Sequence, residues 1–272
     1  MSNSDPAVQL PDTSVFALPT GSYSSRAAFA FRGGSFFDVR PFTATPVLVR
    51  HVAGDLLIDA GFGRAFEQHL RTLPRFRRAA HLVHTPVVDQ LIAAEYDLSH
   101  LTGILLTHSH WDHVSGIADL DVPVLITAAE IEYARNARDD KVFAVVSQDR
   151  RLITIGFDDG PFEGFPASHD HFGDGSVVVV PAAGHTSGSV IVFVRTARER
   201  YAFIGDLAWQ LEGVERVVER PWLMRRLADS DPTRVREDLI RVAALADRYH
   251  IVPAHDARAF RGIPTLSAAA LR

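Results

Sequence analysis

The sequence predicts an α/β protein in which two β-sheets pack together with helices on the outside. Short apolar runs typical of buried strands recur along all 272 residues, and stretches with helical periodicity are interleaved with them. No linker divides these elements into two units, and a chain of this length can bury one large core. We therefore expect a single domain over residues 15–272, preceded by a flexible, polar N-terminal arm over residues 1–14.

The elements of the first half follow from the spacing of their apolar residues. Strands are predicted where short apolar runs lie between Gly and Pro, and helices where Leu and Ile recur at intervals of three and four residues. The strands predicted in this way are 27–31, 47–51, 56–59, 102–106, 122–126 and 152–155, and the helices are 64–78, 86–95 and 128–138.

The second half begins with a loop rich in Gly, Pro and Phe over residues 156–175. One further helix is predicted over residues 232–249, because Asp231 can cap it and Pro232 suits its first position. The remaining strands are 177–180, 190–195, 201–204 and 251–252.

Composition and charge narrow the functional classes. The formal net charge is −5, and nucleic-acid-binding proteins are usually basic, so that partner is not expected. The chain has no cysteine, which excludes disulfides, thiolate nucleophiles and cysteine-based zinc sites. The sequence shows neither an apolar run of about 18 residues that could span a bilayer nor the pattern of a signal peptide. We expect a cytoplasmic protein that acts on a small molecule, with no membrane partner.

Candidate metal ligands stand just past the C-terminal ends of four predicted strands. Four of them lie in the segment His-Ser-His-Trp-Asp-His after the strand at 102–106, and one follows each of the strands at 177–180, 201–204 and 251–252. Strand ends that meet at one edge of a sandwich are a common location for a site. The seven candidates are His108, His110, Asp112, His113, His185, Asp206 and His255.

The first cluster has a spacing that suits metal binding. In an extended segment, His108 and His110 point to the same side, so they can share one metal ion. Asp112 and His113 follow where the chain turns, and they can address a second ion. Imidazole and carboxylate ligands together suit zinc, iron, manganese or cobalt. A single zinc with three ligands would leave several of the candidates without a role, whereas two ions use all of them.

These motifs resemble those of a known family. The segment 108–113 resembles the His-x-His-x-Asp-His signature of the metallo-β-lactamase superfamily, and the match extends in the expected order from about residue 45 to residue 257. Within the superfamily, the segment 86–103 is most similar to the N-acyl-homoserine lactonase-like branch. The other matching motifs are Asp55-Leu56-Leu57-Ile58-Asp59-Ala60-Gly61, Gly184-His185-Thr186-Ser187-Gly188-Ser189, Gly205-Asp206 and Pro253-Ala254-His255-Asp256.

The resemblance implies an αβ/βα four-layer sandwich, in which two mixed sheets are flanked by helices, and a site for two divalent metal ions. It implies that one ion is bound by His108, His110 and His185, and that the other is bound by Asp112, His113 and His255. Asp206 would bridge the two ions, and Asp59 would orient a metal-bound histidine. Zinc is the first expectation for both ions, with iron, manganese or cobalt as alternatives.

Such a site would work through a hydroxide that bridges the two ions. Two metal ions about 3.5–4 Å apart can deprotonate a shared water near neutral pH, and one of them can stabilise the developing oxyanion. Asp206 would hold the pair of ions, and Asp112 could also pass a proton to the leaving group. The sequence contains no Gly-x-Ser-x-Gly motif that would indicate a serine nucleophile.

Departures from individual branches favour some activities over others. His110 stands where the flavodiiron branch has glutamate, and Asp206 stands where true β-lactamases typically have cysteine or serine. The glyoxalase II branch has a helical extension for glutathione, and only 17 residues follow His255 here. The lactonase-like branch often has a tyrosine that polarises the substrate carbonyl at the position that Trp209 occupies. The indole of Trp209 offers an N–H donor but no phenol.

Substrate-binding residues are expected on two segments. The loop over 157–172 could form an apolar lid through Phe165, His171 and Phe172, although these side chains could also pack beneath their own loop. Trp209 begins a second candidate wall, whose apolar residues could alternatively form a homodimer contact.

The sequence therefore predicts a dinuclear metal-dependent hydrolase of a small ester or lactone. The enzymatic alternatives are a thioesterase similar to glyoxalase II and an organophosphate hydrolase. A different class of protein, a metal-binding scaffold that keeps the fold without catalysis, is the remaining alternative.

Overall fold

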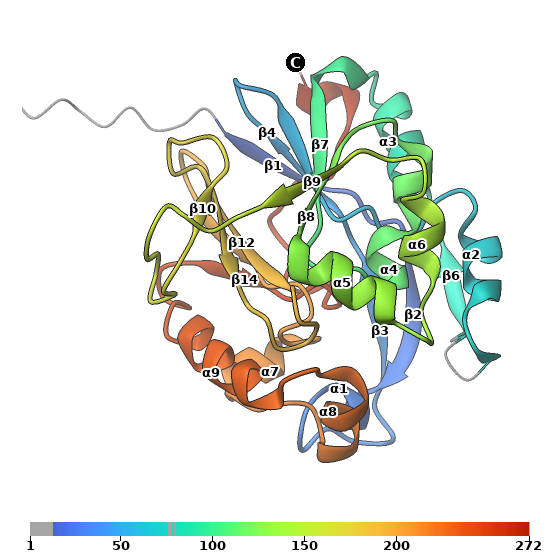
Figure 1. Ribbon diagram of the computed structural model, residues 1–272, viewed down its shortest axis with the longest axis vertical. Helices are drawn as coiled ribbons and strands as arrows, with labels where there is room; N and C mark the ends of the chain where they lie inside the picture. The colour runs from blue at the N-terminus through green and yellow to red at the C-terminus, as the bar shows by residue number, and fades with distance from the viewer. Residues whose placement is uncertain (1–12, 76–77, 79, 272) are drawn as a thin grey trace, which may run out of the picture.

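The computed structural model describes residues 13–75, 78 and 80–271, and it contains the two packed sheets that the sequence predicts (Figure 1). The predicted arm over residues 1–14 lies almost entirely outside the described residues, and Ser14 already begins strand β1. In the six-stranded first sheet, β5, β7, β8 and β9 run parallel to one another. The strand order is β1 (Ser14–Ala17), β4 (Val47–Arg50), β5 (Asp55–Ile58), β7 (Leu101–Leu105), β8 (Val124–Thr127) and β9 (Leu152–Ile155).

The second sheet has five strands, of which β11, β13 and β14 run in the same direction. Their C-terminal ends therefore lie at one edge. The strand order is β10 (His169–Asp170), β11 (Val177–Pro181), β12 (Val190–Arg195), β13 (Arg200–Phe203) and β14 (His250–Val252). A small third sheet consists of β3 (Val39–Ala44), β2 (Gly21–Arg26) and β6 (His81–Val83).

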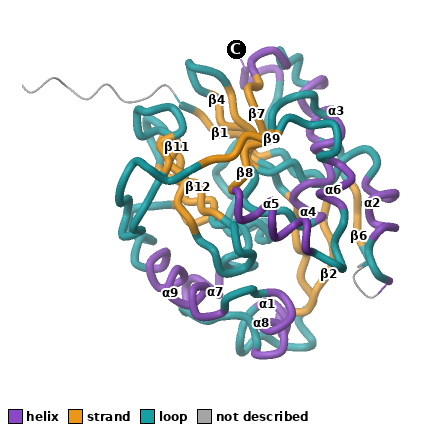
Figure 2. Tube along the Cα trace, viewed as in Figure 1, coloured by secondary structure: helices purple, strands orange, loops and turns teal. Residues whose placement is uncertain are grey.

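The hydrophobic core has three layers because both faces of each main sheet are covered. The valine run of β11 illustrates this arrangement: Val177 and Val179 pack between the two sheets, while Val178 and Val180 face the helices. Side chains alternate between the faces of a strand, so a run that is apolar throughout requires cover on both sides. Helices lie outside both sheets, which gives the expected four layers (Figure 2).

The helices divide between the two sheets. Those that cover the first sheet are α2 (Phe66–Thr72), α3 (Val87–Ala93), α4 (Trp111–Val114), α5 (Ala128–Asn136) and α6 (Val142–Val146). The second sheet is covered by α7 (Leu211–Glu215) and α9 (Pro232–Ala243). In the described part of the chain, no helix is both long enough and apolar enough to cross a bilayer.

Two helices differ most from the sequence-based expectations. Residues 27–31 were expected to form a strand, but Ala27–Ala30 form helix α1, since alanine has the highest helix propensity and β2 ends at Arg26. The second is α8 (Trp222–Ala228), which no apolar periodicity indicated because none of its residues is buried. Helices α1 and α8 lie together at the bottom of Figure 1, where Phe29 and Met224 line the same cavity.

Candidate metal centre

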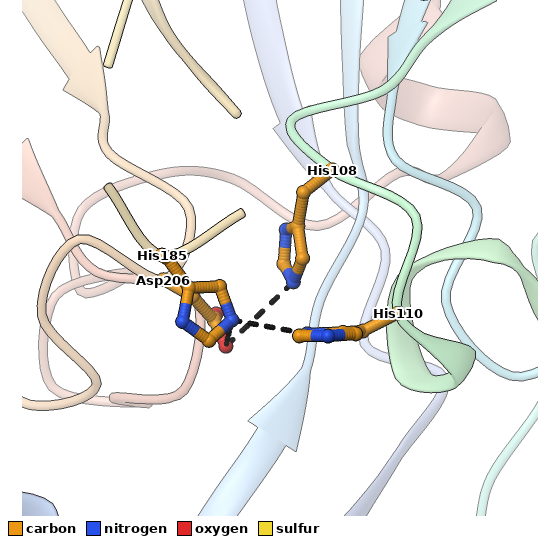
Figure 3. Close-up of side chains that lie close together, drawn as sticks. All are labelled: His108, His110, His185 and Asp206. Atoms are coloured by element: carbon orange, nitrogen blue, oxygen red, sulfur yellow. Dashed lines mark hydrogen bonds and ion pairs between the residues drawn. The ribbon is translucent and has the colours of Figure 1, made fainter. Parts of the chain in front are cut away.

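The candidate ligands meet at the edge where β7 of the first sheet and β11, β13 and β14 of the second sheet end. His108 and His110 follow β7, and α4 then carries Asp112 and His113. His185 lies in the turn between β11 and β12, while Asp206 and His255 follow β13 and β14. Figure 3 shows His108 and His110, from one segment, pointing toward His185 and Asp206, which come from two others. The convergence predicted from the strand ends is therefore present.

Asp206 lies at the centre of the cluster, and its two carboxylate oxygens face different histidines. Oδ2 lies 3.7 Å from Nε2 of His108 and 3.3 Å from Nε2 of His185. Oδ1 lies 3.3 Å from Nε2 of His113 and 3.0 Å from Nε2 of His255. One carboxylate thus connects two groups of imidazoles, an arrangement in which each oxygen can contact a different cation.

The remaining two candidates complete these groups. Nδ1 of His110 lies 3.0 Å from Nε2 of His185, and Oδ2 of Asp112 lies 3.6 Å from Nε2 of His255. Within each group, one potential ligand atom per residue lies within 4.8 Å of all the others. The first group is His108, His110, His185 and Asp206, and the second is Asp112, His113 and His255.

The buried donor atoms of the cluster fit divalent cations. In the described part of the chain, Nε2 of His108, His113 and His255 and Oδ1 of Asp206 are buried without a hydrogen-bond partner. Such unsatisfied atoms are rare in folded proteins and call for an explanation. Imidazole nitrogen and carboxylate oxygen are ligands that zinc and related metals accept, so bound cations would satisfy these atoms.

The outer ring nitrogen of each histidine has a partner in the protein, which aims the inner nitrogen at the cluster. A metal-binding histidine is generally oriented in this way. Two of these partners are carboxylates: Asp59 Oδ2 contacts His113, and Asp229 Oδ1 contacts His185. Two are hydroxyls: Thr107 Oγ1 contacts His108, and Tyr133 Oη contacts His110. The partner of His255 is the Thr43 carbonyl.

Burial and neighbouring charges favour ligand-competent protonation states at two central residues. Burial, assisted by the neighbouring histidines, lowers the pKa of His108 well below its usual value, so its imidazole is neutral at pH 7. Burial opposes ionisation of Asp206, but the surrounding histidines outweigh it and hold the pKa of this carboxyl well below its usual range. Positive charge is therefore favoured next to Asp206, whether it comes from a proton or a cation.

Asp59 links the early strand β5 to the cluster, which is the location expected for it. Its carboxylate accepts hydrogen bonds from the Thr107 backbone N–H and hydroxyl at 2.8 Å, and Oδ2 lies 2.7 Å from Nδ1 of His113. Asp59 has a φ of 57°, a strained conformation for a non-glycine residue. The turn thus directs the carboxylate at His113 instead of continuing the strand.

Glu130 joins the two loops that carry His108 and His185. This buried residue of α5 accepts hydrogen bonds from the backbone N–H and the hydroxyl of Ser109, at 2.8 and 2.6 Å. Its other oxygen accepts from the Thr186 hydroxyl at 2.5 Å and the Gly188 N–H at 3.1 Å. A Cβ at Gly188 would lie 2.1 Å from the Glu130 backbone nitrogen, so only glycine permits this close approach.

A cavity of about 530 Å³ opens beside the cluster. A size of several hundred cubic ångströms is typical of small-molecule sites. Four aromatic residues line it: Tyr23 from β2, Trp111, Trp209 and Tyr133, whose hydroxyl contacts His110. The rest of its wall is formed by His110, Asp112, Asp139, His185, Asp206, Met224, Leu227 and Ala228.

Among the four residues expected in the substrate pocket, only Trp209 lines this cavity; all four are in the described part of the chain. Phe165 is 1% exposed and belongs to the core beneath the second sheet. Phe172 stacks on His51 at a centroid separation of 3.9 Å, and His171 packs against Phe172. Phe165 and Phe172 therefore pack against the hydrophobic core, so the loop over 157–172 does not form a lid over this cavity through these side chains.

Several residues of the site carried no recognisable signal in the sequence. Tyr23 comes from a segment more than 80 residues before the first ligand, and Tyr133 was one helical residue among many. Asp229 contacts His185, and Arg220 contacts both Asp229 and the Asp206 carbonyl. These two residues flank helix α8, which the sequence did not indicate. Only the capping role of Thr127, whose hydroxyl accepts from the Glu130 N–H, could have drawn attention to the start of α5.

The chain is similar in sequence to known proteins. The model of the metallo-β-lactamase superfamily matches residues 39–255. A probable metallo-hydrolase of Mycobacterium bovis is 29% identical over 228 residues, covering 77% of this chain and 73% of that protein.

Solved structures with the same fold are more distant in sequence. An N-acyl homoserine lactone hydrolase, with the product N-hexanoyl-L-homoserine bound at its catalytic metal centre, has a TM-score of 0.73. It is 16% identical, with 94% of this chain and 98% of that chain covered. A dizinc quorum-quenching lactonase has a TM-score of 0.63 and 15% identity, over 92% of this chain and 89% of that chain.

Proposed function

The chain belongs to the metallo-β-lactamase superfamily and is a metal-dependent hydrolase, and we propose that its substrate is a small ester or lactone. We further propose that the reaction takes place at a dinuclear metal site. The observation that supports this proposal most strongly is the position of Asp206. Its two oxygens face two separate groups of buried imidazole nitrogens, at distances between 3.0 and 3.7 Å. A single cation would leave one of these groups without a partner.

The residues of each group are the proposed ligands of one ion. His108, His110 and His185 would hold the first ion, and Asp112, His113 and His255 the second, with Asp206 shared. The donor set favours zinc, and iron, manganese or cobalt would also fit. When bound, two such ions supply an activated water near neutral pH and an electrophilic contact for an acyl oxygen.

One of the proposed ligands, Asp112, and one further side chain, Tyr23, can take part at the reacting atoms. Asp112 lines the cavity, so its carboxylate can accept a proton there and return it to a leaving alkoxide. Burial and the carboxylates of Asp112 and Asp206 raise the pKa of Tyr23 well above its usual value, so its phenol remains a hydrogen-bond donor. Since the Trp209 indole already donates to Asp206 Oδ2 at 2.8 Å, we assign contact with the substrate oxygen to Tyr23 instead.

The walls of the cavity favour a substrate with an apolar acyl or aryl group. Trp111, Trp209, Met224 and Leu227 form much of its apolar surface. A second hollow of about 310 Å³ shares Tyr23, Trp209 and Met224 with the first and extends it along apolar side chains. The similarity in fold to two lactonases agrees with a lactone as the substrate, and a thioester or a phosphotriester is the alternative.

Metal analysis of site variants tests the dinuclear proposal. We expect about two equivalents of metal per purified chain, and we expect Asp206→Ala and His110→Ala to lose most hydrolytic activity. His100→Ala is the matched control, because its side chain is 60% exposed and pairs with Asp97, away from the cluster. Less than one equivalent of metal in the wild type, with no gain on adding zinc or manganese, would favour the scaffold alternative.

A substrate panel tests the reaction class. Lactones, aryl esters, thioesters and phosphotriesters are compared at equal metal content, and we expect the highest kcat/KM for lactones or aryl esters. Activity confined to thioesters or phosphotriesters would replace the proposed substrate class. A cytoplasmic location and a homodimer remain predictions from the sequence, which cell fractionation and light scattering would test.

A further inference from the structure

Arg220 and Asp229 form a buried ion pair at the two ends of helix α8. Their side chains are 2% and 0% exposed. The guanidinium binds the carboxylate through two contacts, from Nε to Oδ2 at 3.3 Å and from Nη2 to Oδ1. The pair therefore closes the base of the segment that places Met224, Leu227 and Ala228 on the cavity wall.

The carboxylate of this pair also contacts a candidate metal ligand. Oδ1 of Asp229 lies 3.2 Å from Nδ1 of His185. An ionised carboxylate can only accept a hydrogen bond, so this contact favours the tautomer of His185 that carries its proton on Nδ1, although Nη2 of Arg220 also lies 3.5 Å from that nitrogen. The lone pair of His185 is then on Nε2, which faces Asp206 at 3.3 Å and His110 at 3.0 Å.

The guanidinium reaches the bridging aspartate from the other side. Nη1 of Arg220 donates to the backbone carbonyl of Asp206 at 2.8 Å. The Arg220 guanidinium also lies over the Trp209 ring, 4.7 Å from its centroid, and the Trp209 indole donates to Oδ2 of Asp206. Arg220 thus holds the Asp206 main chain directly and supports the ring that holds its side chain.

Extending the proposed dinuclear function, on which this inference rests, we propose that Arg220 and Asp229 form a positioning pair that couples the α8 wall of the substrate cavity to the metal ligands His185 and Asp206. Burial of an ion pair is costly unless its geometry and additional hydrogen bonds compensate. Here the shorter additional bonds end on the two ligands, His185 and Asp206, and a longer one of 3.4 Å ends on the carbonyl of Leu207, the residue after Asp206. The same pair sets the orientation of one half of the site and the position of the apolar wall.

The test measures metal retention, which is independent of turnover. Metal-loaded protein is dialysed against a chromophoric chelator at a concentration that leaves both ions on the wild type. We expect Asp229→Asn to bind one of its two ions about 10- to 100-fold more weakly and therefore to lose it to the chelator. Residues that orient metal-bound histidines contribute an affinity of this size. Arg220→Lys should act in the same direction, because an ammonium cannot make the fork and the carbonyl contact together.

Two control variants separate this role from general loss of structure. Asp238→Asn removes the charge of another buried carboxylate that is paired with an arginine, Arg241, and that makes no contact with the cluster. It should retain both ions. Leu227→Ala alters the α8 wall alone, and should raise KM for an apolar ester about tenfold without changing metal retention.

The outcomes distinguish the two levels of the proposal. If Asp229→Asn and Arg220→Lys keep both ions as tightly as Asp238→Asn, the positioning pair is refuted while the dinuclear function stands. If the wild type itself retains less than one ion, both proposals fail. Circular dichroism of the metal-free variants checks folding, and Arg220→Lys decides the question if Asp229→Asn does not fold.

Discussion

Replacement of Glu130 should destabilise the protein far more than its position on a surface helix suggests. Glu130 accepts four hydrogen bonds, two from backbone N–H groups of Ser109 and Gly188 and two from the hydroxyls of Ser109 and Thr186. In Glu130→Ala, the hydroxyls can rotate toward other acceptors, but the two backbone N–H groups remain buried and unsatisfied. At about 1–3 kcal/mol for each such group, we expect a loss of about 4 kcal/mol in the free energy of unfolding.

The isosteric variant Glu130→Gln refines this magnitude. Its amide oxygen can still accept from one loop, while its NH₂ group faces the other. The Thr186 hydroxyl can rotate and accept a hydrogen bond from this NH₂ group. The Gly188 N–H cannot accept, so it faces a donor and remains the one unsatisfied group. We therefore expect a loss of about 2 kcal/mol, intermediate between the wild type and the alanine variant.

Guanidinium denaturation of metal-free protein measures both losses without a contribution from bound ions. Glu132→Ala is the matched control, because Glu132 lies on the same helix, is exposed, and accepts hydrogen bonds from Asn136 of the same helix. Its free energy of unfolding should stay within about 0.5 kcal/mol of the wild type. If Glu130→Ala is also within about 1 kcal/mol of the wild type, the claim that Glu130 ties the two ligand loops together is incorrect.

Two further predictions concern a tyrosine and a histidine. Tyr23→Phe should lower kcat by about 100-fold at unchanged metal content, because the variant lacks a hydrogen-bond donor to the developing oxyanion. The control is Tyr201→Phe, which changes a tyrosine at the far end of β13. If Tyr23→Phe is as active as this control, Tyr23 does not have this role. Burial, together with the neighbouring His169 and His51, lowers the pKa of His171 to about 4, whereas an unfolded histidine titrates near about 6.5. Between these two pKa values the unfolded state binds more protons than the folded state, so the free energy of unfolding should decrease as the pH falls from about 6.5 toward 4. The measurement is the denaturation midpoint as a function of pH. His171→Gln should reduce the slope of this dependence. An unchanged slope would contradict the assignment.

The strand and ligand pattern was predictable because it is encoded locally. Each candidate ligand lies within a few residues of an apolar run. The shared direction of β11 and β13 follows from their short connections through the antiparallel strand β12, and β14 joins them in parallel after the connection that contains α7, α8 and α9. The expected strand at 27–31 was wrong because apolar residues without a clear period fit a short helix equally well. Helix α8 was not expected because its residues are not buried, so it lacks the amphipathic pattern on which helix prediction depends.

The substrate pocket was much less predictable. Phe165 and Phe172 are aromatic residues of a loop, and nothing in their spacing distinguishes a cavity wall from a core beneath that loop. Trp209 was expected near the substrate, and it lines the cavity, but its N–H is directed at Asp206. Which atom an indole N–H reaches depends on the packing around the ring, in this case the guanidinium of Arg220.

The sequence by itself determined the superfamily, the layered α/β architecture and the seven side chains that converge at one sheet edge. These features depend on short-range order, since a ligand two or three residues past a strand end must lie near that end. Only the tertiary structure decided that Asp206 faces both groups of histidines, that Tyr23 reaches the cavity from β2, and that one ion pair joins α8 to His185. Those contacts connect segments far apart in the chain, and their distances result from the packing of the whole core, which no local pattern encodes.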